Sequence, residues 1–206
     1  MSTLHPHRTR YARGDVIYRQ GEHTGRLYRA ETGMVRLLRT TSRGRTVTVR
    51  HVLPGDYFGE DALALPHHPH GAEALTGATI LSFEVGDLRD EQLLDLARSL
   101  GEQLRRTMSY EVHLQSGDLR QRIVRYLLDL ADTPLGSEDA DSRLFVRATH
   151  ELLAEGSGST RESVSKIITE LREHGLIESG YRHITLLDLD GLRHVATQAA
   201  AGGEGA

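Results

Sequence analysis

The stretch THELLAEGSGSTRESVSKIITELREHGL, from Thr149 to Leu176, decides how this chain is organised. Its second half predicts an amphipathic helix, because apolar residues recur every three or four positions and form one stripe. That stripe consists of Val164, Ile167, Ile168 and Leu171. Ser159 is the predicted N-cap, Glu162 completes a capping box, and Gly175 is placed to end the helix.

A shorter helix is predicted from Thr149 to Glu155, with Gly156-Ser157-Gly158 as the turn between the two helices. A short helix, a glycine turn and a second helix with a polar, basic outer face form the plan of a DNA-binding helix-turn-helix. An ordinary pair of packed helices gives the same pattern. The next segment, LIESGYRHITLL, favours DNA binding, because it predicts a β-hairpin wing with Arg182 and His183 at its tip, within reach of phosphate.

The segment STRESVSKIITELREHGLI resembles the recognition-helix signature of the Crp/Fnr family of bacterial transcription regulators, and the resemblance extends over about residues 10 to 187. It implies that the second helix and the wing contact DNA through Ser159, Thr160, Arg161, Glu162, Ser163, Ser165, Lys166, Thr169, Arg182 and His183. Arg161 is expected to read guanine, and Glu162 to accept from a cytosine amine, in palindromic sites with TGTGA-like half-sites. The overall pattern resembles an effector-independent subgroup associated with stress and stationary-phase responses.

Composition narrows the class of protein. The chain has 206 residues, a net charge of −4 and no cysteine, which excludes disulfides, thiolate metal sites and cysteine-held iron–sulfur clusters. No apolar run is long enough to span a membrane, and the N-terminus lacks the apolar segment of a signal peptide, so a cytoplasmic protein is expected. A DNA binder with a negative net charge needs a local positive field, here from Arg161, Lys166 and Arg182.

The first part of the chain consists of short apolar segments separated by glycine, which predicts a β-sandwich or barrel. The predicted strands are Val16-Tyr18, Leu27-Ala30, Val35-Arg39, Thr46-Leu53 and Ile80-Glu84. The polar segment from Met1 to Arg10 is predicted to be loose. Composition alone is equally compatible with a purely structural β-domain.

The segment LPGDYFGE, Leu53 to Glu60, resembles the start of the phosphate-binding cassette in the cyclic-nucleotide-binding jelly roll. The resemblance implies an effector pocket formed by Gly59, Glu60, His70, Gly71, Thr107 and Met108. Cyclic AMP is the candidate effector, and Glu60 would accept from its ribose hydroxyl.

Three of these positions depart from the family pattern. His70 and Gly71 replace an arginine and a serine or threonine that hold the phosphate, and Met108 replaces a serine that contacts the base. An imidazole is a poorer phosphate ligand than a bidentate, permanently charged guanidinium. We therefore expect that no cofactor is required for DNA binding. Arg50 or Arg36, on neighbouring strands, could still restore the phosphate contact.

A histidine-rich loop, Pro66-His67-His68-Pro69-His70, supports a different class of function. Together with His51 or Glu73 it could bind a divalent metal, and His68-x-His70 loosely resembles a cupin motif, so a metal-dependent cupin-type enzyme is the alternative hypothesis. An exposed loop of solvated histidines explains the same residues, and the expectation is that no metal and no catalytic residue is present. A haem-binding sensor within the family stays open.

A long helix is predicted from Asp87 to Ser116. It carries an imperfect coiled-coil seam of Ala97, Leu100, Leu104, Thr107, Glu111 and Leu114, which predicts a homodimer rather than packing on its own β-domain alone. The expected fold class is α+β: a jelly-roll sensor domain at 1–86, a dimerisation helix at 87–116 and a winged helix-turn-helix domain at 117–206. The expected partners are double-stranded DNA, a second copy of the chain and RNA polymerase, with no membrane and no enzymatic activity.

Overall fold

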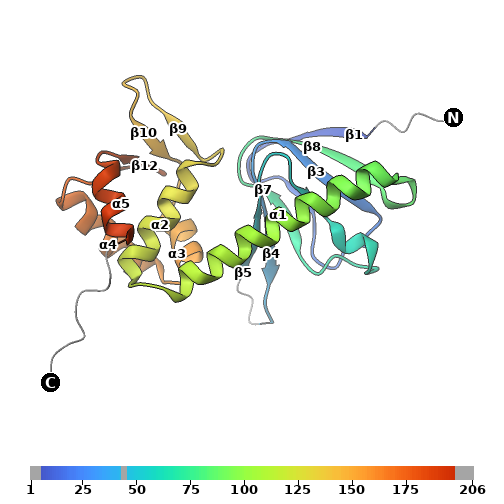
Figure 1. Cartoon of the computed structure of the whole chain (residues 1–206), viewed down its shortest axis with the longest axis horizontal. Coiled ribbons are helices and arrows are strands. Elements are labelled where there is room, and N and C mark those ends of the chain that lie inside the picture. Colours follow the sequence, from blue (N-terminus) through green and yellow to red (C-terminus); the bar gives the residue numbers. More distant parts are fainter. Residues whose placement is uncertain (1–5, 43–45, 198–206) are drawn as a thin grey trace. The chain divides into compact units, whose positions relative to one another are not determined.

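The computed structural model describes residues 6–42 and 46–197 and comprises two compact units, Met1–Met108 and Ser109–Ala206 (Figure 1). The longest helix, α1 (Asp90–Gln115), runs through the boundary between them. The expected domain bounds therefore remain predictions, and their ends at 1–5 and 198–206 lie outside the described residues. The described residues contain no helix long and apolar enough to cross a membrane.

The N-terminal unit is built from two four-stranded antiparallel sheets. The first has the order β1 (His7–Tyr11), β8 (Ala78–Glu84), β3 (Arg26–Thr32) and β6 (Tyr57–Phe58). The second has the order β2 (Val16–Tyr18), β7 (Gly71–Ala74), β4 (Val35–Thr40) and β5 (Thr46–Val52). Short 3-10 turns at Glu60–Leu63 and Val85–Asp87 complete the unit. The strands predicted from the sequence are all present.

The core of this unit is apolar and aromatic, and it consists of Tyr18, Ala30, Val35, Leu37, Val52, Phe58, Ala72, Ala74, Ala78 and Ile80. A second cluster of Leu27, Tyr57 and Leu96 joins α1 to the β3–β6 side, with Leu88 and Leu100 packed against it. Because burial of such side chains stabilises by roughly 25 cal/mol per Å² of apolar surface, these two clusters fix the sheets and the first half of α1 together.

The prediction that Met1 to Arg10 is loose was wrong for His7 to Arg10, and its part at residues 1–5 lies outside the described residues. His7 to Tyr11 form strand β1, which pairs with β8 in register from His7 opposite Ser82 to Tyr11 opposite Ala78. Strand β1 lies at the edge of its sheet, where most of its side chains stay exposed. Its sequence is therefore polar and resembles a loop, although its backbone is paired with β8. The short strands β6 and β7 were also missed.

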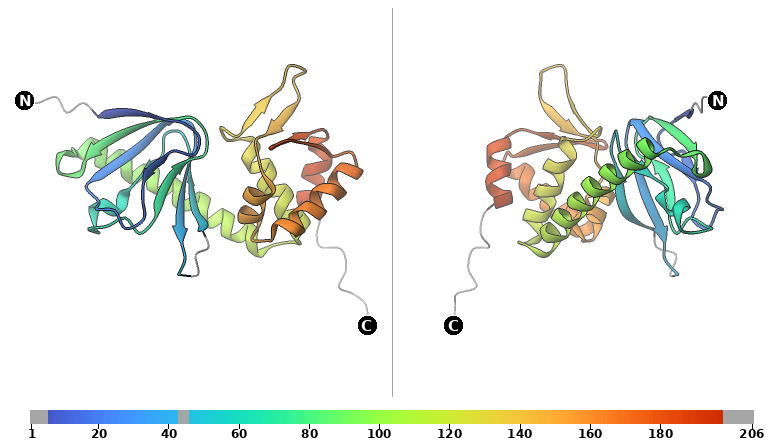
Figure 2. Two further views of the ribbon diagram at one scale, coloured as in Figure 1. Left: turned by 180° about the vertical axis from the view of Figure 1, so that it is seen from behind. Right: turned by 45° about the vertical axis from the view of Figure 1, so that its right-hand side comes forward.

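The C-terminal unit contains α2 (Leu119–Ala131), β9 (Gly136–Glu138), β10 (Leu144–Val146), α3 (His150–Ser157), α4 (Arg161–Glu173), β11 (Ile177–Gly180), β12 (His183–Leu186) and α5 (Leu189–Thr197). Its four strands form one sheet in the order β11, β12, β10, β9, and the β9–β10 hairpin projects from the unit (Figure 2). Asp118 caps α2 in a reciprocal capping box with Gln121.

Candidate nucleic-acid interface

Helices α3 and α4 form the predicted helix-turn-helix, with two local corrections. The N-cap of α4 is Thr160, not Ser159, and its hydroxyl accepts from the Ser163 N–H at 3.3 Å. Glu162 is therefore not part of a capping box. The turn is also shorter than predicted, because Gly156 and Ser157 are buried inside α3, which ends at Gly158 with φ at 63°. The predicted apolar stripe is confirmed at Val164, Ile168 and Leu171.

A glycine is required at position 156 because the ring of Tyr126 occupies the space of its side chain. A Cβ on Gly156 would lie 1.9 Å from that ring. The hydroxyl of Tyr110, in the last turns of α1, donates to the Gly156 carbonyl, and the Tyr110 and Tyr126 rings lie 6.1 Å apart. Burial raises the pKa of Tyr110 to about 12, so this hydroxyl keeps its proton at neutral pH. The end of α1 is thus anchored on α2 and α3.

The outer face of α4 presents an exposed polar and charged surface at its N-terminal end. Arg161, Glu162, Lys166 and Thr169 are exposed, and Ser159, Ser163 and Ser165 are half-buried. In the described part of the chain, Arg161, Glu162 and Lys166 form no ion pair within the protein, so their hydrogen-bonding groups remain available. The Thr169 hydroxyl donates to the Ser165 carbonyl. Burial, and secondly the Arg161 charge, lower the pKa of His150 at the start of α3.

The wing is formed by β11 and β12, with Tyr181 and Arg182 as its two-residue loop. Arg182 is exposed, as predicted, but His183 is not at the tip. The His183 ring is half-buried, packs edge-on against Phe145 at 5.9 Å and lies over Gly180. Tyr181, which the sequence reasoning missed, occupies the tip instead and is 85% exposed.

Charge is unevenly divided between the two units. The C-terminal unit carries ten basic and sixteen acidic residues, for a net charge of −6, whereas the N-terminal unit has fifteen and thirteen, for +2. Several acids of the C-terminal unit lie away from α4 and pair locally, as Asp139 does with Arg143 at 2.9 Å and Asp190 with Arg193 at 3.1 Å. The basic groups near the start of α4 and the wing therefore act as a local field within an acidic unit.

Two residues of the predicted effector pocket, Glu60 and His70, have oppositely charged or titratable partners within the N-terminal unit. Glu60 receives both of its closest contacts from Arg50, at 2.8 and 3.0 Å. His70 lies 3.5 Å from the carboxylate of Asp61. Gly59 is in the left-handed conformation that starts the turn at Glu60–Leu63. Arg50, which could have contacted a phosphate, therefore pairs with Glu60, the residue expected to hold the ribose.

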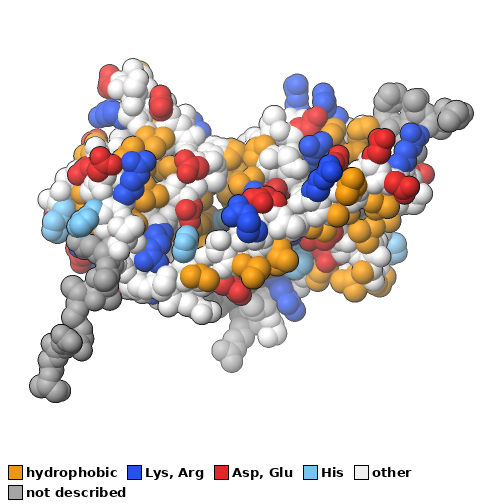
Figure 3. Space-filling view, viewed as in Figure 1, with side chains coloured by type: hydrophobic (Ala, Val, Ile, Leu, Met, Phe, Trp, Pro, Cys, Tyr) orange, Lys and Arg blue, Asp and Glu red, His pale blue; other side chains and the backbone are white. Residues whose placement is uncertain are grey.

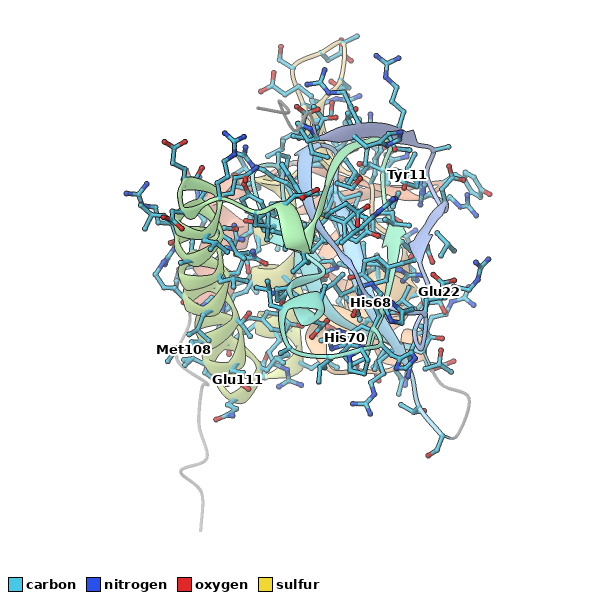
Figure 4. All side chains as sticks on the ribbon, turned by 90° about the vertical axis from the view of Figure 1, so that its right-hand side faces the viewer. Tyr11, Glu22, His68, His70, Met108 and Glu111 are labelled. Carbon is cyan, nitrogen blue, oxygen red and sulfur yellow. The ribbon has the colours of Figure 1, made fainter. Side chains whose placement is uncertain are left out.

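The other arginine considered for the phosphate is also engaged, since Arg36 pairs with Glu73 at 3.3 Å. Gly71 lies in β7 opposite Leu38, and a Cβ there would meet the Leu38 side chain at 3.3 Å. Thr107 donates its hydroxyl to the Gln103 carbonyl on its own helix. Met108 is 60% exposed on the side of α1 that faces away from His68 and His70 (Figure 4).

Polar contacts attach helix α1 to the β-sheets of the N-terminal unit, and we call these contacts the polar clamp. The Ser99 hydroxyl accepts from the Tyr57 N–H at 3.0 Å, and Gln103 donates to the Tyr57 carbonyl at 2.9 Å. Arg106 contacts the nearly buried carboxylate of Asp56 at 2.5 Å. Asp56 also accepts from the Leu53 N–H at 2.9 Å. The clamp therefore fixes α1 to the first residues of the cassette.

The histidines of the loop do not form the proposed cupin-type centre. His68 is buried and stacks on Tyr18 with ring centroids 3.8 Å apart, whereas His67 lies edge-on to His23 at 5.8 Å. Burial lowers the pKa of both His68 and His51. Across residues 6–42 and 46–197, no group of three or more His, Asp or Glu side chains has a geometry that could hold a metal ion.

The exposed apolar stripe of α1 is rotated from the predicted seam. Leu100 is half-buried against the cluster of Leu27, Tyr57 and Leu96, and Leu114 is half-buried in the C-terminal unit. One group of exposed apolar or small residues lies along α1, namely Leu94, Ala97, Gly101, Leu104, Met108 and Val112. Their spacing of three and four residues forms one continuous stripe, part of which is visible as a row of orange side chains over α1 in Figure 3.

Comparison with known proteins identifies two domain families in the chain. Residues 8–92 match the cyclic nucleotide-binding domain, and residues 121–195 match the Crp-like helix-turn-helix domain. The transcriptional regulator LdrP of Thermus thermophilus is 47% identical over 92% of this chain and 97% of its own length. The transcriptional regulator SdrP of the same species is 38% identical over 92% of this chain and 94% of its own length.

Solved structures agree with these relatives. A crystal structure of a CRP-family transcriptional regulator from Thermus thermophilus is 47% identical and superimposes with a TM-score of 0.88, over 93% of this chain and 97% of that one. A CRP/FNR-family regulator from the same organism is 36% identical with a TM-score of 0.85, over 94% of this chain and 100% of that one. The similarity covers both units and α1.

Proposed function

Because the chain belongs to the Crp family of DNA-binding transcription regulators, we propose that it binds palindromic promoter sites as a homodimer and does so without a cyclic nucleotide. The observation that carries the DNA-binding part is the set of Arg161, Glu162 and Lys166. These side chains are exposed at the start of α4 and have no ion-pair partner in the described part of the chain. Exposed guanidinium, carboxylate and ammonium groups of this kind can form hydrogen bonds with base edges and phosphates.

The arrangement of these three side chains suits base-edge recognition. Arg161 can donate two hydrogen bonds to O6 and N7 of guanine, and Glu162 can accept from the amino group of cytosine. Lys166 lies one helical turn further along α4 and adds positive charge. The order Arg-Glu-x-x-x-Lys supports the proposal of TGTGA-like half-sites, with centres about one helical turn apart in a two-fold dimer. Thr160, Ser163 and Thr169 serve first to shape α4 and line its outer face.

The homodimer is proposed to form through the exposed stripe of α1. Leu104, Met108 and Val112 are 60 to 64% exposed, a degree of exposure that is unfavourable for three apolar side chains on one helix face. Two such stripes packed against each other would bury these side chains in the manner of a coiled coil. This geometry also places one recognition helix in each half of the dimer, as a palindromic site requires.

The proposal of effector independence is carried by the pairing of Arg50 with Glu60. In a nucleotide-dependent site, an arginine holds the phosphate and a glutamate the ribose, so both would have to be free to accept the ligand. Here His70 stands in place of that arginine, and Arg50, which could replace it, pairs with Glu60 instead. The polar clamp of Ser99, Gln103 and Arg106 already fixes α1 to the roll. Loss of a charge-assisted bidentate phosphate contact removes roughly 2–5 kcal/mol of binding free energy, enough to move a micromolar ligand towards millimolar affinity.

The proposed setting follows from this function. A regulator that reads promoter DNA works beside the chromosome, in the cytoplasm, and RNA polymerase is the protein partner that we propose for it. The relationship to the transcriptional regulators SdrP and LdrP supports a regulator without catalytic activity. The assignment to a stress or stationary-phase response stays a proposal that only the identity of its target promoters can support.

Selection of binding sites from random duplex DNA by the purified protein tests the proposal directly. It should be carried out in parallel with and without cyclic AMP. The expected result is the same palindromic sequence in both selections. Enrichment of no sequence at all would refute the DNA-binding role, and enrichment only with cyclic AMP would refute effector independence.

A further inference from the structure

The wing tip has a conformation that the fold of the hairpin does not explain by itself. Gly180 pairs with His183, which leaves Tyr181 and Arg182 as a two-residue loop. Arg182 has φ at 59°, and only one other non-glycine among the described residues, Ser142, has a positive φ. Glycine or asparagine relieves strain at such a position, so an arginine there is retained against the local preference. Backbone strain of this kind points to a role for the side chain.

The base of the tip is rigidly packed. A Cβ on Gly180 would lie 2.2 Å from the His183 ring, so a glycine is needed for that ring to lie across the hairpin. His183 is held from the other side by Phe145 on β10, and its Nδ1 lies 3.2 Å from the Tyr181 carbonyl. With His183 turned inward, the Tyr181 side chain is left outside. It is 85% exposed, more than any other large hydrophobic side chain in the described residues.

The two loop side chains form one unit. The Arg182 guanidinium lies over the Tyr181 ring, 5.4 Å from its centroid, in a cation–π contact that brings the two side chains together. Together they offer a flat apolar ring next to a permanent positive charge. The deoxyribose and phosphate of a DNA strand have the complementary arrangement, an apolar sugar face next to a permanent negative charge.

We propose, on the basis of the DNA-binding function above, that Tyr181 is a DNA-contacting residue whose ring packs on a deoxyribose just outside each half-site. Arg182 pairs with the adjoining phosphate. The wing is continuous with the recognition helix, since α4 ends at Glu173 and β11 begins at Ile177. A single exposed ring is far too small for a stable protein–protein interface, whereas a duplex already held by α4 needs only a local contact. The tip thus extends the footprint of the protein beyond the bases that α4 reads.

The test compares full-length protein on two duplexes. Both carry TGTGA half-sites in inverted repeat, but one has flanks of about one helical turn on each side and the other ends at the outer edges of the half-sites. Tyr181→Ala should weaken binding to the flanked duplex about tenfold, and to the trimmed duplex less than about twofold, because base-independent ring contacts are lost only where the flank exists. Tyr181→Phe, which keeps the ring, should bind both duplexes within about twofold of the wild type.

Leu187→Ala is the matched control, because Leu187 is another exposed apolar residue of the same unit. This variant should bind both duplexes with the affinity of the wild type.

Arg182→Gly separates structure from contact, because glycine relaxes the positive φ while removing the guanidinium. The folded protein should be at least as stable in thermal unfolding, and the slope of log affinity against log salt should shrink by about two for a dimer that loses one phosphate contact per half-site. Tyr181→Ala should leave that slope nearly unchanged.

Equal effects of Tyr181→Ala on the flanked and trimmed duplexes, or no effect on either, would overturn the assignment. So would a fall in the thermal stability of Tyr181→Ala that accounts for its loss of binding. If the wild-type protein binds neither duplex nor any sequence selected from random DNA, the proposed function fails, and this inference fails with it. If the wild type binds and only the flank dependence is missing, the wing-tip assignment alone is wrong.

Discussion

The cassette of the N-terminal unit and the outer face of the DNA-binding unit treat charge in opposite ways. In the cassette, half-buried Glu60 pairs with Arg50, and buried Asp56 pairs with Arg106. On the outer face of α4, Arg161 and Lys166 are exposed and form no ion pair in the described part of the chain. The difference teaches that pairing, rather than residue type, distinguishes a closed site from an open interface. Both regions carry basic side chains, but in the described part of the chain only those on the outer face of α4 lack an ion-pair partner.

The largest effect is expected when the dimer that joins the two DNA-binding units through the exposed stripe of α1 is disrupted. Leu104→Glu combined with Met108→Glu places charges on the exposed stripe of α1 and should produce monomers. A monomer engages one half-site at a time, so operator affinity should fall by at least about 100-fold. Sedimentation and gel shift measure both quantities. Ser109→Glu adds a charge on the same helix outside the stripe and should leave the dimer intact. A double variant that remains dimeric would show that the stripe has another role.

The next largest effect concerns the open face of α4. Arg161→Ala should cost roughly 1–3 kcal/mol of binding free energy per half-site and relax the preference at one base position, because the arginine reads a guanine. Random DNA should be affected much less. Arg172→Ala, an exposed arginine in the last turn of the same helix, serves as the control for charge alone. If specific and random duplexes lose the same affinity, Arg161 contacts the backbone and not a base.

A smaller effect is expected when the ion pair between Glu60 and Arg50 is removed. Glu60→Gln leaves Arg50 half-buried without its carboxylate and should reduce the free energy of unfolding by about 1–2 kcal/mol. Adding Arg50→Gln should recover part of this loss, which a double-mutant cycle from urea unfolding measures. Asp95→Asn removes the exposed pair with Arg98 and should cost less than about 0.5 kcal/mol. Additive losses at Glu60 and Arg50 would mean that their contact contributes nothing.

The buried histidine of β5, His51, should also make the stability of the N-terminal unit depend on pH. Burial, and secondly the charge of Arg36, lower the pKa of His51 from 6.5 to about 4. As pH falls below 6.5, the unfolded chain binds a proton that the folded chain refuses, so stability is full above that value and is lost towards pH 4. The loss is at most about 1.4 kcal/mol per pH unit for one group. His51→Leu should flatten this decline in urea unfolding at about pH 7 and about pH 5. An unchanged decline would assign it to other groups.

Sequence reasoning reached the parts of the fold that repeat locally. The stripe of Val164, Ile168 and Leu171 predicted α4, and the strands with β-branched residues were found as well. What it missed depends on residues distant in the chain. Gly156 lies inside α3 because Tyr126, thirty positions earlier, occupies the space of a side chain.

The candidate sites follow the same rule. Arg161, Glu162 and Lys166 were identified from their periodicity and their resemblance to a known signature, and they are exposed as that reasoning required. The pairing of Arg50 with Glu60 was not foreseen, because it joins a strand to a turn across the roll. Tyr181 was overlooked beside Arg182 and His183, since nothing local to the sequence says that the His183 ring turns inward onto Phe145.

Because the charged residues of the cassette are paired with each other, the DNA-binding face is proposed to bind its operator without a cyclic nucleotide. The most direct test is operator affinity of the wild-type protein measured while cyclic AMP is titrated, with nucleotide binding followed in parallel by calorimetry. The account predicts no micromolar binding of cyclic AMP and a change in operator affinity of less than about twofold, against the roughly 5–150-fold of a typical allosteric coupling. Micromolar binding of cyclic AMP together with a tenfold or larger gain in operator affinity, about 1.4 kcal/mol, would contradict it.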